Sequence, residues 1–99
     1  MLDDIAQHLG LLNVSVHIPQ ARSLKDKRMV LKSLKERIKN RFNISLSEVE
    51  GQDTWQSATL AIAMVSGDHK IIDASFQKIL LFMEASGSLN VCEQKIEYF

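Results

Sequence analysis

The chain has 99 residues, of which 45% are hydrophobic and 24% charged, with one cysteine and a formal net charge of zero. This length predicts a single domain that needs neither disulfides nor a metal to fold, and a lone cysteine fits a reducing cytoplasm. The longest apolar runs, 60–65 and 79–83, are much shorter than the roughly 20 residues that cross a bilayer, and residues 1–8 lack the pattern of a secretory signal. We therefore expect a cytoplasmic protein with no membrane partner.

Charge is unevenly distributed along the chain. Between Arg22 and Arg41, nine basic residues are opposed by two acidic ones, so this segment carries +7. The remainder has three basic and ten acidic residues and carries −7. Charge in blocks of this kind predicts one basic face, which would meet nucleic acid, an acidic protein or water.

Apolar and polar side chains alternate over residues 11–18, which predicts a β-strand that Pro19 ends. Ser23 and Asp26 then have the spacing of a capping box at the start of a helix. Apolar residues recur at helical spacing from there, which predicts an amphipathic helix over residues 24–41.

The next region predicts two strands joined by a polar connection. Alternation over residues 42–50 indicates the second strand, residues 51–57 the connection, and residues 58–65 a third strand that is apolar on both faces. A sheet that carries its helices on one face is usually polar on the other. An apolar outer face is often covered by a second copy of the chain, so we expect a homodimer.

A turn and a helix N-cap at residues 66–68 precede apolar residues at helical spacing, and Ser86 and Gly87 end this second helix. Residues 89–99 predict a last strand, whose period slips near residues 93–95 as at a β-bulge.

The predicted order is β-α-β-β-α-β. Its simplest closure is an α+β, ferredoxin-like βαββαβ sandwich, with a four-stranded antiparallel sheet and both helices on one face. We expect residues 1–99 to form this single domain, with residues 1–9 as an N-terminal tail or short extension.

This connectivity places the start of the first helix and the 51–57 connection at the same end of the molecule. Cations in the first turn of a helix oppose its macrodipole, whereas basic side chains and free N–H groups together attract anions. The candidate anion or nucleic-acid site comprises Arg22, Ser23, Lys25, Lys27, Arg28 and Lys32. The facing loop, taken together with the end of the second strand, supplies Glu48, Gln52, Asp53, Trp55 and Gln56.

A structural alternative exists for two of these groups. Lys27 falls within the apolar stripe of the helix, and Glu48 falls on the same strand face as Leu46, so the two would pair and tie helix to sheet. Trp55 would either stack on a base or anchor a partner, or else close the end of the core.

Catalytic and metal chemistry have little support. His8, His17 and His69 are not spaced as metal ligands, and Cys92 has the pattern of a strand hydrophobe. Glu48 and Asp53 alone are weak evidence for acid–base catalysis. The segment 19–23 lacks the glycine-rich phosphate loop of acylphosphatases, which share the expected fold. We expect no enzymatic role, cofactor or metal.

Several short motifs resemble a known family. They are the segment 23–28, then Arg41-Phe42-Asn43, Glu48-Val49, Gln52-Asp53 and Trp55-Gln56. Together they resemble the YlxP-like family of small bacterial proteins of unknown function, over residues 9–97. The resemblance implies a ferredoxin-like fold and a gene often found among translation and ribosome-maturation genes. It implies no catalytic residues.

Two functions remain open. The first is an accessory factor that binds RNA or the ribosome through the basic first helix, by charge and shape, since strand 58–65 has no aromatic residue to stack bases. The second is a protein-interaction or self-association module that uses the open face of the sheet.

Overall fold

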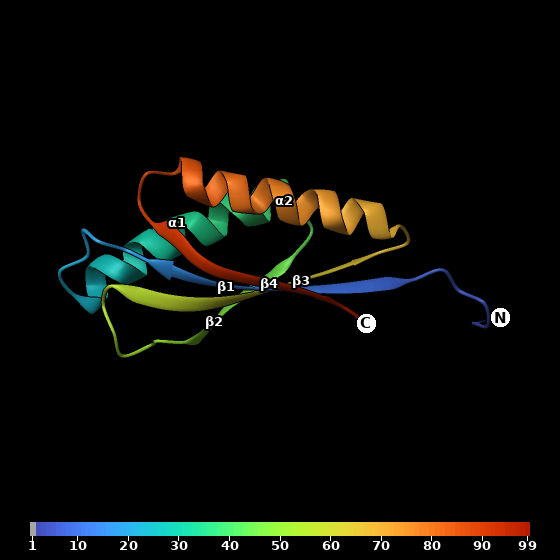
Figure 1. Ribbon diagram of the computed structural model, residues 1–99, viewed down its shortest axis with the longest axis horizontal. Helices are drawn as coiled ribbons and strands as arrows, with labels where there is room; N and C mark the ends of the chain where they lie inside the picture. Colours follow the sequence, from blue (N-terminus) through green and yellow to red (C-terminus); the bar gives the residue numbers. More distant parts are fainter. Residues whose placement is uncertain (1) are drawn as a thin grey trace.

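The computed structural model describes residues 2–99 and has the predicted β-α-β-β-α-β order. Its elements are β1 (His8–His17), α1 (Leu24–Arg41), β2 (Ser45–Glu50), β3 (Ser57–Ser66), α2 (His69–Ala85) and β4 (Asn90–Tyr98). The strands form one sheet in the order β2-β3-β1-β4, and every neighbouring pair is antiparallel. Both helices lie on the same face of the sheet (Figure 1). The α+β ferredoxin-like prediction is confirmed.

Helix α1 begins and ends where its local sequence directs. Ser23 Oγ accepts a hydrogen bond from the backbone N–H of Asp26 at 3.0 Å, and Asp26 Oδ2 accepts one from the N–H of Arg22 at 2.9 Å. At the other end, the N–H of Phe42 still donates to the carbonyl of Ile38. Because Phe42 closes the helix in this way, β2 begins later than predicted, at Ser45.

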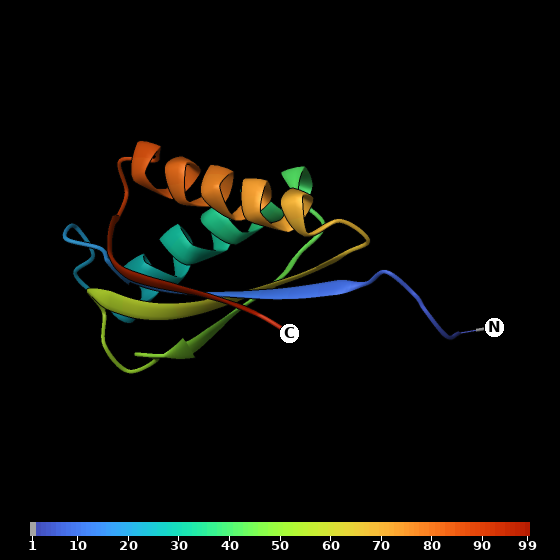
Figure 2. The ribbon, with the colours of Figure 1, turned by 45° about the vertical axis from the view of Figure 1, so that its right-hand side comes forward.

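The core lies between the inner face of the sheet and the two helices (Figure 2). Alternate residues of β1 and β3 are buried there, against a buried row on α2. The closest approach is at Gly10 of β1. A Cβ at this position would lie 2.5 Å from Ile72 Cγ2 and 2.9 Å from Phe76 Cε2. The absence of a side chain at Gly10 therefore lets α2 pack directly on the strand.

Both edge strands contain a β-bulge. In β4, Ser15 and Val16 of β1 face Glu93 and Val91, which leaves Cys92 as the extra, exposed residue. The predicted bulge is therefore present, but at Cys92, just before the predicted residues 93–95. A second bulge, which the sequence did not indicate, leaves Val49 of β2 unpaired.

The chain enters the sheet earlier than predicted. β1 begins at His8, so the N-terminal arm that projects from the body comprises residues 2–7 (Figure 1). Met1, part of the predicted tail, lies outside the described residues. No helix within the described part of the chain combines the length and apolar character needed to cross a membrane.

Candidate functional site

Lys27 is the most deeply buried charged residue at the end where α1 begins. Only 1% of it is exposed. Its Nζ donates to Glu48 Oε2 at 2.8 Å, to the carbonyl of Gly51 at 2.6 Å and to the carbonyl of Ser57 at 3.2 Å. All three ammonium protons thus have acceptors. The predicted Lys27–Glu48 pair is present, and it joins α1 to β2 and to the 51–57 connection.

The 51–57 connection lies beside the segment between β1 and α1, as the connectivity predicts. Gln56 Nε2 donates to the carbonyls of Pro19 at 3.3 Å and Ala21 at 3.1 Å. Gln52 Nε2 donates to the carbonyl of Glu48 at 3.4 Å. Asp53 is exposed and forms no ion pair with residues 2–99. The two glutamines therefore help hold the loops, and Asp53 stays free in solvent.

Trp55 does not close the core. Its side chain is 52% exposed and is not among the residues packed against the core cluster. It lines an open hollow with His17, Gln56 and Ser57. The core-closing interpretation is wrong, and the indole is available to stack on a ligand.

Five cations of α1 form one continuous row, which we call the α1 stripe. Its members are Lys25, Arg28, Lys32, Lys35 and Lys39. Successive members are three or four residues apart, which places them on one flank of the helix, about 21 Å from end to end at 1.5 Å per residue. None forms an ion pair with another side chain among residues 2–99. The stripe is therefore a row of uncompensated positive charge.

The remaining basic residues near α1 lie elsewhere. Arg37 and Arg41 lie on the opposite flank, where their guanidinium carbons are 4.7 and 5.5 Å from the centre of the Phe82 ring. These cation–π contacts help pack α1 against α2. Arg22 is exposed in the connection before the helix, and Ser23 acts as the N-cap. Of the sequence candidates, Lys25, Arg28 and Lys32 lie on the α1 stripe, whereas Ser23 and Lys27 have structural partners.

A groove separates the α1 stripe from β2, with a cavity volume of about 250 Å³. Its apolar lining comes from Leu31, Leu34, Leu46 and Leu60. Three members of the stripe, Arg28, Lys32 and Lys35, line it from the helix, and Glu48 lines it from the strand. The groove therefore combines an apolar lining with cations along one side, which suits an anion with an apolar body.

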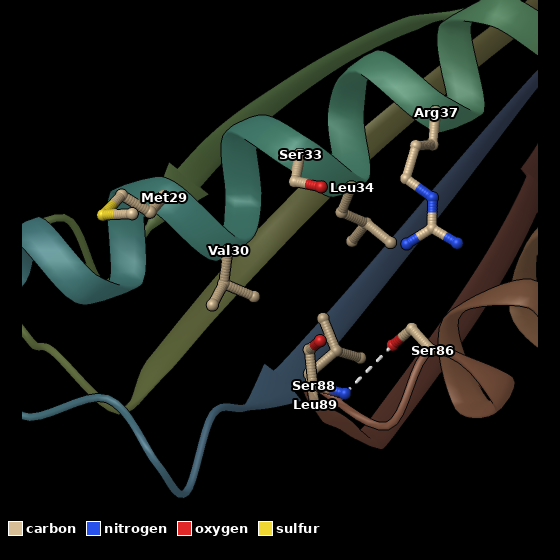
Figure 3. Close-up of a pocket in the computed structure, with 8 residues that line it drawn as sticks. All are labelled: Met29, Val30, Ser33, Leu34, Arg37, Ser86, Ser88 and Leu89. Carbon is tan, nitrogen blue, oxygen red and sulfur yellow. Dashed lines mark hydrogen bonds between the residues drawn. The ribbon is translucent and has the colours of Figure 1, made fainter.

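A second hollow of about 260 Å³ lies on the other flank of α1, beside the segment that joins α2 to β4 (Figure 3). Val30, Leu34 and Leu89 line it, and the backbone N–H of Ser88 donates to Ser86 Oγ at its edge. The cation at this hollow, Arg37, also lies over the Phe82 ring. This hollow has less positive charge than the groove beside the stripe.

The outer face of the sheet is apolar at one end. Leu9 and Val65 face each other across β1 and β3, and the N–H of Phe99 donates to the carbonyl of Leu9. Val65 and Phe99 are 64% and 70% exposed. Toward the other end, Ser15 and Thr59 face each other instead. The expected apolar outer face is thus most exposed at the end where the N-terminal arm begins, continues through Leu11, Ala63 and Ala61, and becomes polar at Ser15 and Thr59.

An aromatic and titratable cluster lies at that same end. The rings of His69 and Tyr98 have centres 4.1 Å apart, and those of His69 and His8 6.0 Å apart. The Tyr98 hydroxyl donates to Asp73 Oδ1 at 3.0 Å. Burial, followed by the hydrogen bond and the charge of Asp73, raises the pKa of Tyr98. Residues 2–99 contain no group of three His, Cys, Asp or Glu side chains that could hold a metal ion.

Comparison with known proteins agrees with the resemblance seen in the motifs. Residues 9–96 match the family described as protein of unknown function DUF503. The chain belongs to this family. It is also 35% identical over 91 residues to the uncharacterized protein YlxP of Bacillus subtilis. The matched residues cover 92% of the chain and 99% of that relative.

Solved structures share the fold at low sequence identity. The de novo designed protein Foldit4 has a TM-score of 0.58 and 11% identity, covering 94% of the chain and 96% of the design. SnoaB, a cofactor-independent oxygenase from Streptomyces nogalater, has a TM-score of 0.52 and 14% identity, covering 95% of the chain and 92% of SnoaB. These likenesses show the fold alone.

Sequence reasoning missed two features of the site. Lys35 and Lys39 belong to the α1 stripe, and the repeated spacing of three and four residues could have extended the candidate set to them. The groove beside the stripe could not have been found in this way, because its lining comes from both α1 and the sheet.

Proposed function

We propose that this DUF503-family protein is a non-enzymatic, cytoplasmic accessory factor that binds RNA, free or in the ribosome, through the α1 stripe. The α1 stripe itself is the observation that carries this proposal. Five cations in a row, without ion-pair partners among residues 2–99, match the charge of a phosphate backbone.

Two further features support RNA as the anion. Lys27 anchors the start of α1 to β2 and to the 51–57 connection, so the stripe sits on a fixed helix. The exposed Trp55 lies in that same connection and offers an aromatic face to an unpaired base. Stacking at Trp55 would add a contact beside the start of α1, from which the phosphate contacts of the stripe would continue along the helix.

The test measures binding of the full chain to ribosomal subunits and to a structured RNA at low and physiological salt. The stripe variant is Lys25→Gln/Arg28→Gln/Lys32→Gln. Its control, Lys70→Gln/Lys78→Gln/Lys95→Gln, removes the same charge from exposed positions on α2 and β4. Trp55 is the only tryptophan in the chain, so its fluorescence also reports binding at this end.

We expect saturable binding that weakens with salt, is lost in the stripe variant and is kept in the control. Absence of binding at low salt would refute the proposal. An equal loss in both variants would also refute it, because only net charge would then matter.

A second candidate function is self-association through the apolar end of the outer sheet face. Leu9, Val65 and Phe99 form an exposed apolar group there, and a second copy of the chain could cover it. Analytical ultracentrifugation of the wild type and of Val65→Lys tests this. A dimer that Val65→Lys dissociates would support it, and a wild-type monomer at high concentration would refute it.

A further inference from the structure

The groove between α1 and β2 has features that phosphate binding alone does not require. The α1 stripe could bind a phosphate backbone from a flat helix surface. Instead, three of its members border a cavity of about 250 Å³ lined by four leucines. This volume is below the range usual for drug-sized ligands, so it fits a single small planar group.

We infer that this groove takes one unpaired nucleobase of an RNA whose phosphates lie on the α1 stripe. The inference rests on the proposed function and names the form of RNA that the site selects. The base would enter between Leu31 and Leu46, and its flanking phosphates would meet Lys32 and Lys35. Arg28 also borders the groove, and a guanidinium plane stacks well on a base.

Glu48 supplies a hydrogen-bond acceptor for the base. Its Oε2 is occupied by Lys27, whereas its Oε1 has no hydrogen-bond partner among residues 2–99. The side chain is 23% exposed, so a ligand in the groove can reach it. A carboxylate oxygen accepts from an exocyclic amino group. Adenine offers its exocyclic amino group on a two-ring stacking surface, whereas uracil offers only its ring N3–H on a single ring, so we expect adenine to bind more tightly than uracil.

The structure favours a base over an extended acidic peptide as the occupant. An extended peptide that binds by strand addition would pair with the free edge of β2. The bulge at Val49 interrupts that edge and leaves only Ser45–Glu48 in continuous register with β3. This ladder is short for strand addition. A nucleobase needs no backbone ladder, because apolar contact, stacking and one acceptor hold it.

The experiment compares two RNA hairpins with the same stem, one fully paired and one with a single unpaired adenine in the stem. We expect the wild type to bind the hairpin with the unpaired base about tenfold or more tightly, in line with the effect of burying one base. Replacing that adenine by uracil should weaken binding. With the fluorescent analogue 2-aminopurine at the same position, binding should change its emission.

Two matched variants locate the base. Leu31→Phe fills the groove, whereas Met29→Phe adds an aromatic ring at an exposed position of the same helix that does not line it. Leu31→Phe should bring the affinity for the unpaired-base hairpin down to that for the paired one and remove the 2-aminopurine signal. Met29→Phe should do neither.

The outcomes separate this inference from the proposed function. Equal wild-type affinity for both hairpins, still dependent on the α1 stripe, would refute base insertion and leave RNA binding intact. The comparison of the two hairpins uses only the wild type, so it does not depend on whether any variant folds. No binding to either hairpin would refute both. Tighter binding of an acidic, leucine-containing peptide, lost in Leu31→Phe, would overturn the assignment of the groove to a base.

Discussion

The ammonium group of Lys27 lies 2.8 Å from Glu48 Oε2 and also donates to the backbone carbonyls of Gly51 and Ser57. One side chain of α1 therefore holds the end of β2 and both ends of the connection that follows it. The start of α1 is positioned by this ion pair and its hydrogen bonds as well as by apolar packing. The orientation of the α1 stripe depends on it in turn.

Lys27→Met should lower the free energy of unfolding by about 3 kcal/mol. The substitution leaves the partly buried Glu48 carboxylate without a counter-ion and two carbonyls without a donor. Urea denaturation measures this loss. In a double-mutant cycle with Glu48→Gln, the combined loss should be smaller than the sum by about 1–3 kcal/mol, because both variants disrupt one contact. Lys25→Met is the control, since Lys25 is exposed, and an equal loss there would contradict the account.

Removing three members of the α1 stripe should reduce the salt dependence of RNA binding. Each lost phosphate contact lowers the slope of log K against log salt by about 0.7–0.9, so the variant Lys25→Gln/Arg28→Gln/Lys32→Gln should show a slope smaller by about 2–3. A salt titration of RNA affinity gives this slope. The control at Lys70, Lys78 and Lys95 should keep the wild-type value, and a parallel decrease in it would argue against a defined binding surface.

Lys25→Gln on its own should leave the protein at least as stable as the wild type. Lys25 lies in the first turn of α1, where the helix macrodipole disfavours a cation by about 0.3–1 kcal/mol. Thermal or urea unfolding measures the change. A clear loss of stability would show that Lys25 makes a stabilising contact. A gain would show that Lys25 lowers the stability of the fold, as binding residues often do.

Gly10→Ala should destabilise the fold by about 1–3 kcal/mol. Its new methyl group would overlap Ile72 and Phe76 of α2, and the helix would have to move away from β1. Gly67→Ala is the matched control, because a Cβ there comes no closer than 3.6 Å to the carbonyl of Ala6. Denaturation of both variants tests this, and equal effects would mean that α2 does not press on β1.

The stability of the protein should fall at alkaline pH through Tyr98. Burial, then the hydrogen bond and charge of Asp73, raises the pKa of Tyr98 in the folded state above its ordinary value of 10.0. The neutral hydroxyl is thus favoured by folding. Its contribution is fully present below pH 10 and is lost as the pH rises through the folded pKa. Tyr98→Phe should remove this dependence. Tyr98 is the only tyrosine, so tyrosinate absorbance follows it directly, and a titration at or below pH 10 would contradict the assignment.

Local signals in the sequence predicted most of the fold. The capping box of Ser23 and Asp26 placed the start of α1 at the right residue, because its hydrogen bonds are made within one turn. The period of β1 was clear because its inner face is fully buried. The start of β2 was predicted too early, at Phe42. The alternation of apolar and polar residues includes Phe42, but its backbone N–H still donates to the carbonyl of Ile38 at the end of α1.

The parts that depend on partners distant in sequence were harder to predict. The pairing of Lys27 with Glu48 could be predicted because each is a charged residue at a position otherwise expected to be apolar. Lys27 lies in the apolar stripe of the helix, and Glu48 lies on the strand face of Leu46. The bulge at Val49 left no such mark, because it arises from the register between β2 and β3. The exposure of Trp55 likewise depends on how the 51–57 connection folds over the end of the sheet.

The two bulges have a consequence for how the molecule behaves at high concentration. A sheet grows into fibres when an outer strand offers an unbroken row of N–H and carbonyl groups to the next chain. Here Val49 interrupts one outer strand and Cys92 the other, so neither side presents a full-length template. The protein can therefore expose apolar side chains such as Val65 on the outer face of its sheet while neither edge strand offers a full-length template for polymerisation through backbone hydrogen bonds.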